Sequence, residues 1–371
     1  MSHSLPLVIL GRPGDPRPTV SVLVKAYNHA AYVRRTIDSI LAQSFQDFEI
    51  VVTDDASTDG TADILRSYRD PRIKLATLSV NLGISGAMNA TIDRSRGRYL
   101  AILNSDDWSF PGRLQQQVDC LARNPEISLV FGLPKMIGEH DEPVQTENDF
   151  AAPLRFPDMS RTTWLRYFFY NANCLSAPTA MIRREAYKTV GAYDRRLTNL
   201  QDFDMWIRML AAGFNIRLLP DEVTAVRIRA NQANMSAPSL GKMIRSGFEL
   251  GKILRRYASM DQRLLDGIFG AALGGPHTTG KPMPMRLAEL ALRDSRREYH
   301  AFALDLIYEN AADQADFDWL RELAETLDPR GWRAIEHLRG ALTAQTAIAE
   351  NRPIPNTAAP HRDEIGRHAD L

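Results

Sequence analysis

The N-terminal third of the chain alternates between short apolar runs and amphipathic stretches. Val20–Val24 is a continuous apolar, β-branched run, which is typical of a buried strand. The runs that predict further strands are Ile50–Thr53, Ile73–Leu78, Tyr99–Leu103 and Ser128–Phe131. Helical spacing or turn and capping residues between them predict helices at Val33–Leu41, Ala62–Tyr68, Ile84–Arg94 and Pro111–Ala122. This alternation predicts an α/β fold with a Rossmann-like, mostly parallel central sheet flanked by helices.

Acidic residues follow two of the predicted strands at the point where each strand ends. Asp54 and Asp55 follow the second strand, and Asp106 and Asp107 follow the fourth. In open α/β sheets, ligands bind outside the carboxyl ends of the strands. The spacing therefore predicts that the four carboxylates converge on one crevice.

Beyond the fifth strand the pattern is less regular. Gly138–Phe156 is acidic and rich in loop-forming residues, which predicts a flexible connection beside the crevice. Arg161–Tyr170 is aromatic-rich, Ala180–Ile182 predicts a strand, and Arg184–Val190 and Phe203–Ala212 predict helices.

The pattern changes again at about Ser239, after which no strand is predicted. The predicted helices are Leu240–Met260, Met285–Asn310, Phe317–Thr326 and Arg330–Thr346. We therefore expect a loose leader over residues 1–18, an α/β domain over 19–238 and an all-helical region over 239–346. The Pro-rich, polar tail over 347–371 is expected to be disordered.

Composition excludes several classes of protein. Lys and Arg together number 45, as do Asp and Glu, so the chain has no net basic charge with which to bind nucleic acid. The two cysteines, Cys120 and Cys174, form no disulfide framework, which favours a reducing compartment. No apolar run approaches the roughly 20 residues of a membrane span, and the leader lacks signal-peptide features. We therefore expect a cytoplasmic protein, free or peripheral on the inner membrane face.

The acidic pairs suit two kinds of chemistry. Asp106 and Asp107 offer the hard oxygen ligands that Mg²⁺ or Mn²⁺ takes together with phosphate oxygens. The alternative is an acidic capping pair before Pro111. Asp202 and Asp204, at the start of a predicted helix, are candidates for a general base, and helix capping is again the alternative.

A second set of residues suits recognition of a nucleotide. Asp55, at a strand end, can accept a hydrogen bond from a pyrimidine N–H, and Tyr27 can stack on the base. The alternative for the stretch from Asp54 to Asp59 is plain turn chemistry.

The helix expected from Leu240 combines basic and apolar residues. Lys242, Arg245, Lys252, Arg255 and Arg256 alternate with Met243, Ile244, Phe248, Ile253 and Leu254. A basic amphipathic helix can lie on an anionic membrane surface, and it can equally pack on the rest of the protein with its basic residues in solvent. The helices from Met285 to Thr346 are compatible with a homodimer interface or with a monomeric cap.

Read together, these motifs closely resemble family 2 glycosyltransferases of the GT-A fold. The resemblance covers about Thr19 to Ser236. Its motifs are Val20–Val24, Tyr27-Asn28, Ser39–Phe45, Phe48–Thr61, Asn81-Leu82-Gly83, Gly97-Arg98-Tyr99, Asn104–Asp107, Met181–Arg184, Val190–Asp194 and Gln201–Trp206.

The resemblance implies an inverting transfer of a sugar from a nucleotide diphosphate donor, usually a UDP-sugar, to a saccharide or glycolipid hydroxyl. Bacterial surface polysaccharide synthesis is the pathway that fits. The acidic motif Asp106 and Asp107 would bind the divalent metal, Mn²⁺ or Mg²⁺, and Asp202 would be the base. The implied donor-binding residues are Ala26, Tyr27, Asn28, Asp54, Asp55, Asn81 and Asp106.

Four positions depart from the family pattern. Asn104 replaces a first Asp of the metal motif, Met88 stands where many members carry Arg, and Gln201 replaces a Glu. Arg229 lies near a position that is often His. These departures keep open a second hypothesis, a catalytically degenerate protein that acts as a nucleotide-sugar-binding or scaffold subunit.

Overall fold

A computed structural model describes residues 17–144, 159–229, 240–273 and 281–311, with residues 316, 318 and 319. The predicted leader up to residue 16, most of the connection Gly138–Phe156 and the tail 347–371 lie outside these residues. So do the predicted helix Arg330–Thr346 and nearly all of Phe317–Thr326. The chain divides into two compact units, Met1–Ile268 and Phe269–Leu371.

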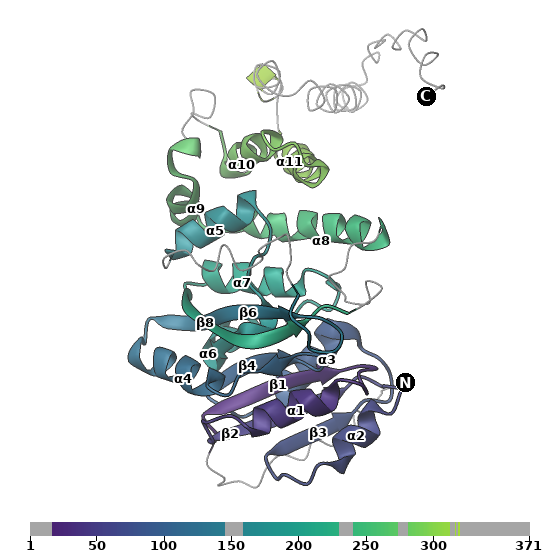
Figure 1. The fold of residues 1–371 in the computed structure, drawn as a ribbon. Helices are drawn as coiled ribbons and strands as arrows, with labels where there is room; N and C mark the ends of the chain where they lie inside the picture. The colour runs from purple at the N-terminus through teal and green to yellow at the C-terminus, as the bar shows by residue number, and fades with distance from the viewer. Residues whose placement is uncertain are drawn as a thin grey trace, which may run out of the picture. The chain divides into compact units, whose positions relative to one another are not determined.

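The first unit contains one mixed sheet with the strand order β3-β2-β1-β4-β7-β6-β8-β5 (Figure 1). The strands are β1 (Val20–Ala26), β2 (Phe48–Asp54), β3 (Ile73–Thr77), β4 (Tyr99–Asn104), β5 (Trp108–Ser109), β6 (Ile127–Ile137), β7 (Met181–Arg183) and β8 (Asn215–Arg227). The strands β3, β2, β1 and β4 pair in parallel, which confirms the predicted parallel core. Strand β7 is antiparallel to β4 and β6, and β5 is antiparallel to β8.

Helices cover both faces of the parallel core. The helices of this unit are α1 (Val33–Leu41), α2 (Thr61–Ser67), α3 (Gly83–Arg94), α4 (Arg113–Arg123), α5 (Arg161–Tyr170), α6 (Arg184–Val190), α7 (Gln201–Ala211), α8 (Leu240–Ala258) and nearly all of α9 (Gln262–Phe269). On one face, alternate strand residues such as Val22 and Val52 form a core with apolar side chains of α1, α2 and α4. On the other face α3 packs on β1 and β2, where the Thr53 and Thr91 hydroxyls lie 2.6 Å apart. The predicted α/β class is confirmed.

The boundary between the two units falls later than the change in sequence pattern near Ser239. Helix α8 lies in the first unit because its buried face contacts that unit, through Tyr257 and the fully buried Ile253 among others. The Tyr257 hydroxyl donates to the Leu165 carbonyl of α5 at 2.8 Å.

In the second unit, α10 (Met283–Leu292) packs against α11 (Arg297–Asn310). The prediction of one helix over Met285–Asn310 is wrong, because the chain turns between Arg293 and Arg296. The Asp294 carboxylate accepts hydrogen bonds from the backbone and side chain of Arg296, which stabilises a local turn instead of another helical turn. The homodimer interface predicted for these helices stays a prediction. Among the described helices, none combines the length and apolarity needed to cross a bilayer.

Candidate active site

The carboxyl ends of β1, β2 and β4 lie side by side and bring the predicted acidic motifs together. In the parallel register Ala26 pairs with Asp54, and Lys25 pairs with Asn104. The loops that follow these strands therefore leave the sheet at one edge. The strands that carry the acidic pairs thus end at one edge, and the predicted convergence of the four carboxylates on one crevice stays a prediction.

The loop after β1 is fastened to the loop after β2. Asn28 has a left-handed backbone, with φ 53°, and its side-chain oxygen accepts the Thr58 N–H at 2.8 Å. Its own N–H donates to the Ser57 hydroxyl at 3.0 Å. Asn28 therefore shapes the loop. Tyr27 is 46% exposed and is open to contact with a ligand.

Asp55 organises the next turn of the site. Its carboxylate accepts the Leu82 N–H at 2.7 Å, and its carbonyl accepts the Asn81 side-chain amide at 3.2 Å. Gly83, with φ 72°, takes a conformation that glycine adopts without strain and donates its N–H to Asn81 Oδ1. Burial raises the pKa of Asp55. Asp55 and Asn81, far apart in sequence, thus form one structural unit.

Asp54 and Ala26 lie behind these loops and are buried. Asp54 Oδ2 accepts the Ser57 N–H at 3.3 Å, whereas Asp54 Oδ1 is buried without a hydrogen-bond partner among the described residues. Ala26 contributes its carbonyl, which accepts the Asp55 N–H at 2.8 Å. A buried carboxylate oxygen without a donor is costly, so a donor group on a ligand would satisfy it.

The two carboxylates of the second acidic motif have different surroundings. Asp107 is buried, and its two oxygens accept the Arg227 N–H and the Asn104 side-chain amide, each at 2.8 Å. Burial and the neighbouring Asp106 raise the pKa of Asp107 to about 8. Neither residue caps α4, whose start has no side-chain cap, so the capping alternative is not observed. Both oxygens of Asp107 thus have internal donors, and the role of Asp107 as a metal ligand stays a prediction.

Asp106 faces a different set of groups. Its Oδ2 lies 3.8 Å from His29 Nε2 and 3.5 Å from Arg229 Nε. The other ring nitrogen of His29 lies 2.7 Å from the Ser105 hydroxyl, which orients the imidazole. Burial lowers the pKa of His29 despite the nearby Asp106. A neutral imidazole and a carboxylate therefore lie together at the edge of the sheet.

Arg227, at the end of β8, holds the acidic turn in place. The guanidinium is buried, and its Nε donates to the Asp106 carbonyl at 2.9 Å. The same side chain donates to the Gly138 and Glu139 carbonyls at 2.9 and 2.7 Å. The described start of the predicted Gly138–Phe156 connection is thus fastened to the acidic motif.

The charge of Lys25 acts on both the acidic motif and the candidate base. Its ammonium donates to Asn104 Oδ1 at 2.8 Å, and Asn104 in turn donates to Asp107. The positive charge of Lys25 favours the ionised forms of Asp107 and Asp202, and so lowers the pKa of each against the larger effect of burial. Asn104, one of the departures from the family pattern, is therefore the acceptor that this lysine requires.

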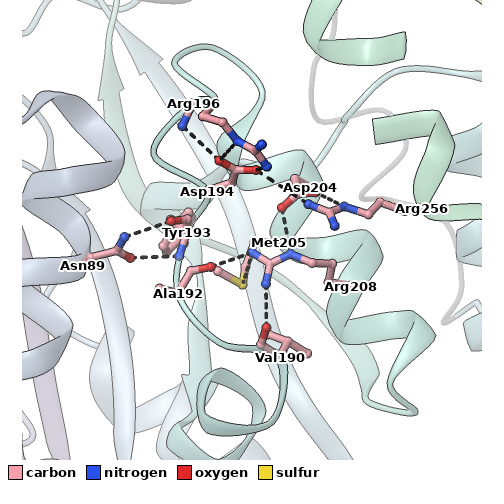
Figure 2. Close-up of polar contacts among 10 residues, drawn as sticks. All are labelled: Asn89, Val190, Ala192, Tyr193, Asp194, Arg196, Asp204, Met205, Arg208 and Arg256. Carbon is pink, nitrogen blue, oxygen red and sulfur yellow. Dashed lines mark hydrogen bonds and ion pairs between the residues drawn. The ribbon is translucent and has the colours of Figure 1, made fainter. Parts of the chain in front are cut away.

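The two acidic residues at the start of α7 have different roles. Asp204 is fully buried, and its two oxygens accept Arg208 Nε at 2.7 Å and Arg256 Nε at 2.8 Å (Figure 2). Arg208 also donates to the Val190 and Ala192 carbonyls, so Asp204 belongs to a network that joins α6, α7 and α8. Because each oxygen of Asp204 accepts a hydrogen bond from an arginine, neither is available to take a proton from a substrate.

We expect Asp204→Asn to act on stability. An amide cannot accept from both guanidinium groups, which would leave a buried network incomplete. The free energy of unfolding should fall by about 2 kcal/mol, because both arginines are partly exposed and water can satisfy them. Chemical denaturation measures this loss. An unchanged midpoint would show that the network contributes nothing to the fold.

Asp202 has different surroundings from Asp204. Burial raises its pKa, while hydrogen bonds from Gln201 and Tyr193 partly offset that effect. The bond from Gln201 Nε2 is long, at 3.4 Å, and the other end of that amide, Gln201 Oε1, is buried without a partner among the described residues. Helix α7 has no side-chain cap, so the capping alternative is not observed for Asp202.

The site residues fit a divalent cation held jointly with a ligand. Asp106 offers a hard carboxylate oxygen, and His29 offers a neutral imidazole nitrogen next to it. No group of three His, Cys, Asp or Glu side chains is placed to hold a metal in the described part of the chain. The remaining ligands would be phosphate oxygens and water, as is usual for Mg²⁺.

Several of these residues were not predicted as site residues. Lys25, His29 and Arg227 lack a motif of their own. The one sequence signal for Lys25 is its position directly after the apolar run Val20–Val24. Arg229 was noted only as a departure, and the structure places it beside Asp106.

Comparisons with known proteins relate the chain to a family of transferases. The family model described as "Glycosyl transferase family 2" matches residues 21–191. A putative teichuronic acid biosynthesis glycosyltransferase, TuaG of Bacillus subtilis, is 32% identical over 53% of this chain and 74% of its own length. An Escherichia coli protein, WfaP, named a UDP-Glc:alpha-D-GlcNAc-diphosphoundecaprenol beta-1,3-glucosyltransferase, is 26% identical over 63% of this chain and 86% of its own.

A solved structure shares the fold. S. aureus TarS 1-349, crystallised in complex with UDP-GlcNAc, superposes with a TM-score of 0.56 at 18% identity. The match covers 90% of this chain and 92% of that one. At this identity the likeness concerns the fold.

Proposed function

We propose a specific reaction for this chain, which belongs to glycosyl transferase family 2. It would transfer a sugar with inversion from a nucleotide diphosphate donor to a hydroxyl of a saccharide or lipid-linked saccharide. The observation that carries the proposal is the edge at which Ala26 pairs with Asp54 and Lys25 pairs with Asn104, together with the charge of Lys25, which acts on both Asp107 and Asp202.

The donor would lie across the loops after β1 and β2. Tyr27 would stack on the base, and Asp55 would accept a base N–H through the carboxylate that also holds the Asn81–Gly83 turn. Ala26 and Asn28 shape the loop beneath it. The unpartnered Asp54 Oδ1 supports a further donor contact from this side.

Asp202 would act as the general base. Its carboxylate takes the proton of the acceptor hydroxyl while that oxygen attacks the anomeric carbon. The bond between the anomeric carbon and the diphosphate oxygen breaks, and its electron pair leaves with the nucleotide diphosphate. Because attack and departure are on opposite faces, the configuration inverts. The raised pKa of Asp202 makes it a stronger base than a solvated carboxylate.

Positive charge must offset the charge that the leaving diphosphate gains. A divalent cation bound by Asp106 and the diphosphate would act as a Lewis acid there. His29 is the protein group next to Asp106 that can complete such a site. Arg229, 3.5 Å from Asp106, would contribute a fixed guanidinium charge on the same side.

The relatives support a substrate class. One is named for teichuronic acid biosynthesis, and another for transfer from UDP-Glc to a diphosphoundecaprenol-linked sugar. We therefore propose a UDP-sugar donor and an acceptor in bacterial surface polysaccharide synthesis. The neutral overall charge gives no support to a nucleic-acid partner.

A thermal-shift panel of UDP, GDP, dTDP and CMP, each with and without Mn²⁺, tests the proposal. A ligand that binds only the folded state raises the melting temperature by mass action. We expect UDP to give the largest shift, and the shift to require Mn²⁺. A larger shift with GDP or dTDP would indicate a donor linked to that nucleotide instead. No shift with any nucleotide would favour the degenerate scaffold subunit.

A further inference from the structure

Exposed apolar side chains gather on one helix. Eight large hydrophobic side chains are exposed in the described part of the chain, and four of them lie in the first half of α8. These are Leu240, Met243, Ile244 and Phe248, with exposed fractions of 76%, 64%, 66% and 66%. We call them the α8 ridge. Such a cluster marks an interaction surface more often than scattered residues do.

The ridge lies on the side of the helix that faces away from the protein. Leu240, Ile244 and Phe248 are spaced by four residues and so share one face. The buried residues of α8 are Glu249, Ile253, Leu254 and Tyr257, which lie in the second half of the helix, with Glu249 on the side opposite the ridge. Helix α8 therefore carries apolar residues in both halves, and those of the ridge are exposed among the described residues of the first unit.

The buried face is firmly attached. The Glu249 carboxylate accepts the backbone N–H groups of Thr198, Asn199 and Leu200 at 2.8 to 3.0 Å. Arg256 donates to Asp204 at 2.8 Å. The α8 ridge is thus carried on an ordered helix that is fixed to the segment just before α7.

The surroundings of the ridge are basic. Helix α8 has one acidic residue, Glu249, and that residue is buried. Arg245 and Lys252 are exposed and Arg255 is half-buried. In a chain without net charge, this helix has a local excess of positive charge around exposed apolar residues.

We propose that the α8 ridge docks on an anionic lipid surface. Its apolar side chains would enter the interfacial region, while Arg245, Lys252 and Arg255 would contact lipid phosphates. A bilayer fits better than a second copy, because a twofold contact through this helix would bring the same basic residues together.

The proposed docking has a consequence that rests on the proposed function. The face opposite the ridge holds residues 198–200, which directly precede α7 and Asp202. A docked α8 would therefore keep the base at a fixed position relative to the membrane. That geometry suits an acceptor whose sugar is attached to a lipid.

Vesicle co-sedimentation of the full chain tests the docking without any nucleotide. We compare phosphatidylcholine vesicles with vesicles that also contain phosphatidylglycerol, at low and high salt. The apolar variant is Ile244→Ser/Phe248→Ser and the charge variant is Lys252→Gln/Arg255→Gln. Tyr308→Ser removes an exposed hydrophobic of similar exposure, 55%, from α11 and serves as the control. Thermal melting confirms that each variant is folded.

We expect the wild-type chain and the control to bind the phosphatidylglycerol vesicles and to release at high salt. The apolar variant should bind at least tenfold more weakly, and each lost charge should weaken binding about fivefold. Failure of the wild type to bind, or unchanged binding by the apolar variant, overturns the proposal. A dimer that this variant dissociates, with no vesicle binding, would identify a second copy as the occupant. A failed nucleotide panel with intact vesicle binding would overturn the proposed function alone.

Discussion

Asp202→Asn should leave a folded protein that still binds the donor but has lost transfer by a factor of about 10²–10⁴. The amide keeps the size of the side chain and can still accept the hydrogen bond from Tyr193. It cannot take a proton from the acceptor hydroxyl. Initial rates with a purified acceptor measure the loss, and a thermal shift with the nucleotide confirms that donor binding remains.

The pH dependence gives a second readout of the same residue. A base acts in its deprotonated form, so the wild-type kcat/KM should fall as the pH drops through the pKa of Asp202. Because burial raises this pKa, the fall should begin at higher pH than for a solvated aspartate. The acid limb should be absent from the residual activity of Asp202→Asn. Wild-type rates in this variant, or the same limb in its residual activity, would remove Asp202 from the role of base.

Asp106→Asn should abolish the part of the nucleotide thermal shift that depends on Mn²⁺ and should lower transfer by about a hundredfold or more. The reason is that Asp106 is the carboxylate of the motif whose side chain faces His29 and Arg229. An amide oxygen is a weaker ligand for a hard cation than a carboxylate. Nucleotide melting curves over a series of Mn²⁺ concentrations measure the effect.

Asp107→Asn is the matched control for that experiment. Its carboxylate accepts two internal donors, from Arg227 and Asn104, so the substitution should lower stability and keep the Mn²⁺ dependence. The opposite pattern, with metal dependence lost in Asp107→Asn and kept in Asp106→Asn, would exchange the two roles. If the wild-type chain still transfers sugar after EDTA has removed divalent metal, Arg229 would be the group that offsets the negative charge of the leaving diphosphate.

The sequence alone was sufficient to predict the edge of the sheet at which the candidate site lies. Buried strand runs that end in Asp54-Asp55 and Asn104–Asp107 place these residues at one edge, because parallel neighbouring strands end on the same side. Spacing also located the start of α7 and both of its carboxylates. These patterns are local in sequence. Residues at the ends of neighbouring parallel strands lie close together in any sheet of this kind.

The sequence pattern did not reveal which carboxylate of each pair is occupied by hydrogen-bond donors of the protein itself. Asp202 and Asp204 are alike in sequence, but Asp204 accepts hydrogen bonds from Arg208 of the same helix and from Arg256 of a distant helix. In the same way the backbone N–H of Arg227, 120 positions along the chain, donates to the carboxylate of Asp107. The first unit extends beyond the change in sequence pattern near Ser239 for a related reason, because Glu249 and Tyr257 attach α8 to segments that precede it by tens of residues.

The path of contacts from Lys25 through Asn104 and Asp107 to Arg227 has a consequence for synthesis of the chain. It joins the first strand of the sheet to the last, so the acidic turn is made long before its final partner leaves the ribosome. Contacts between distant segments form late because a long loop must close first. A nascent chain that ends before β8 would carry every proposed donor motif, but its acidic turn would lack the Arg227 contacts that hold it. Full donor affinity should therefore appear only once the last strand has joined the sheet, so a half-made chain would bind the donor weakly.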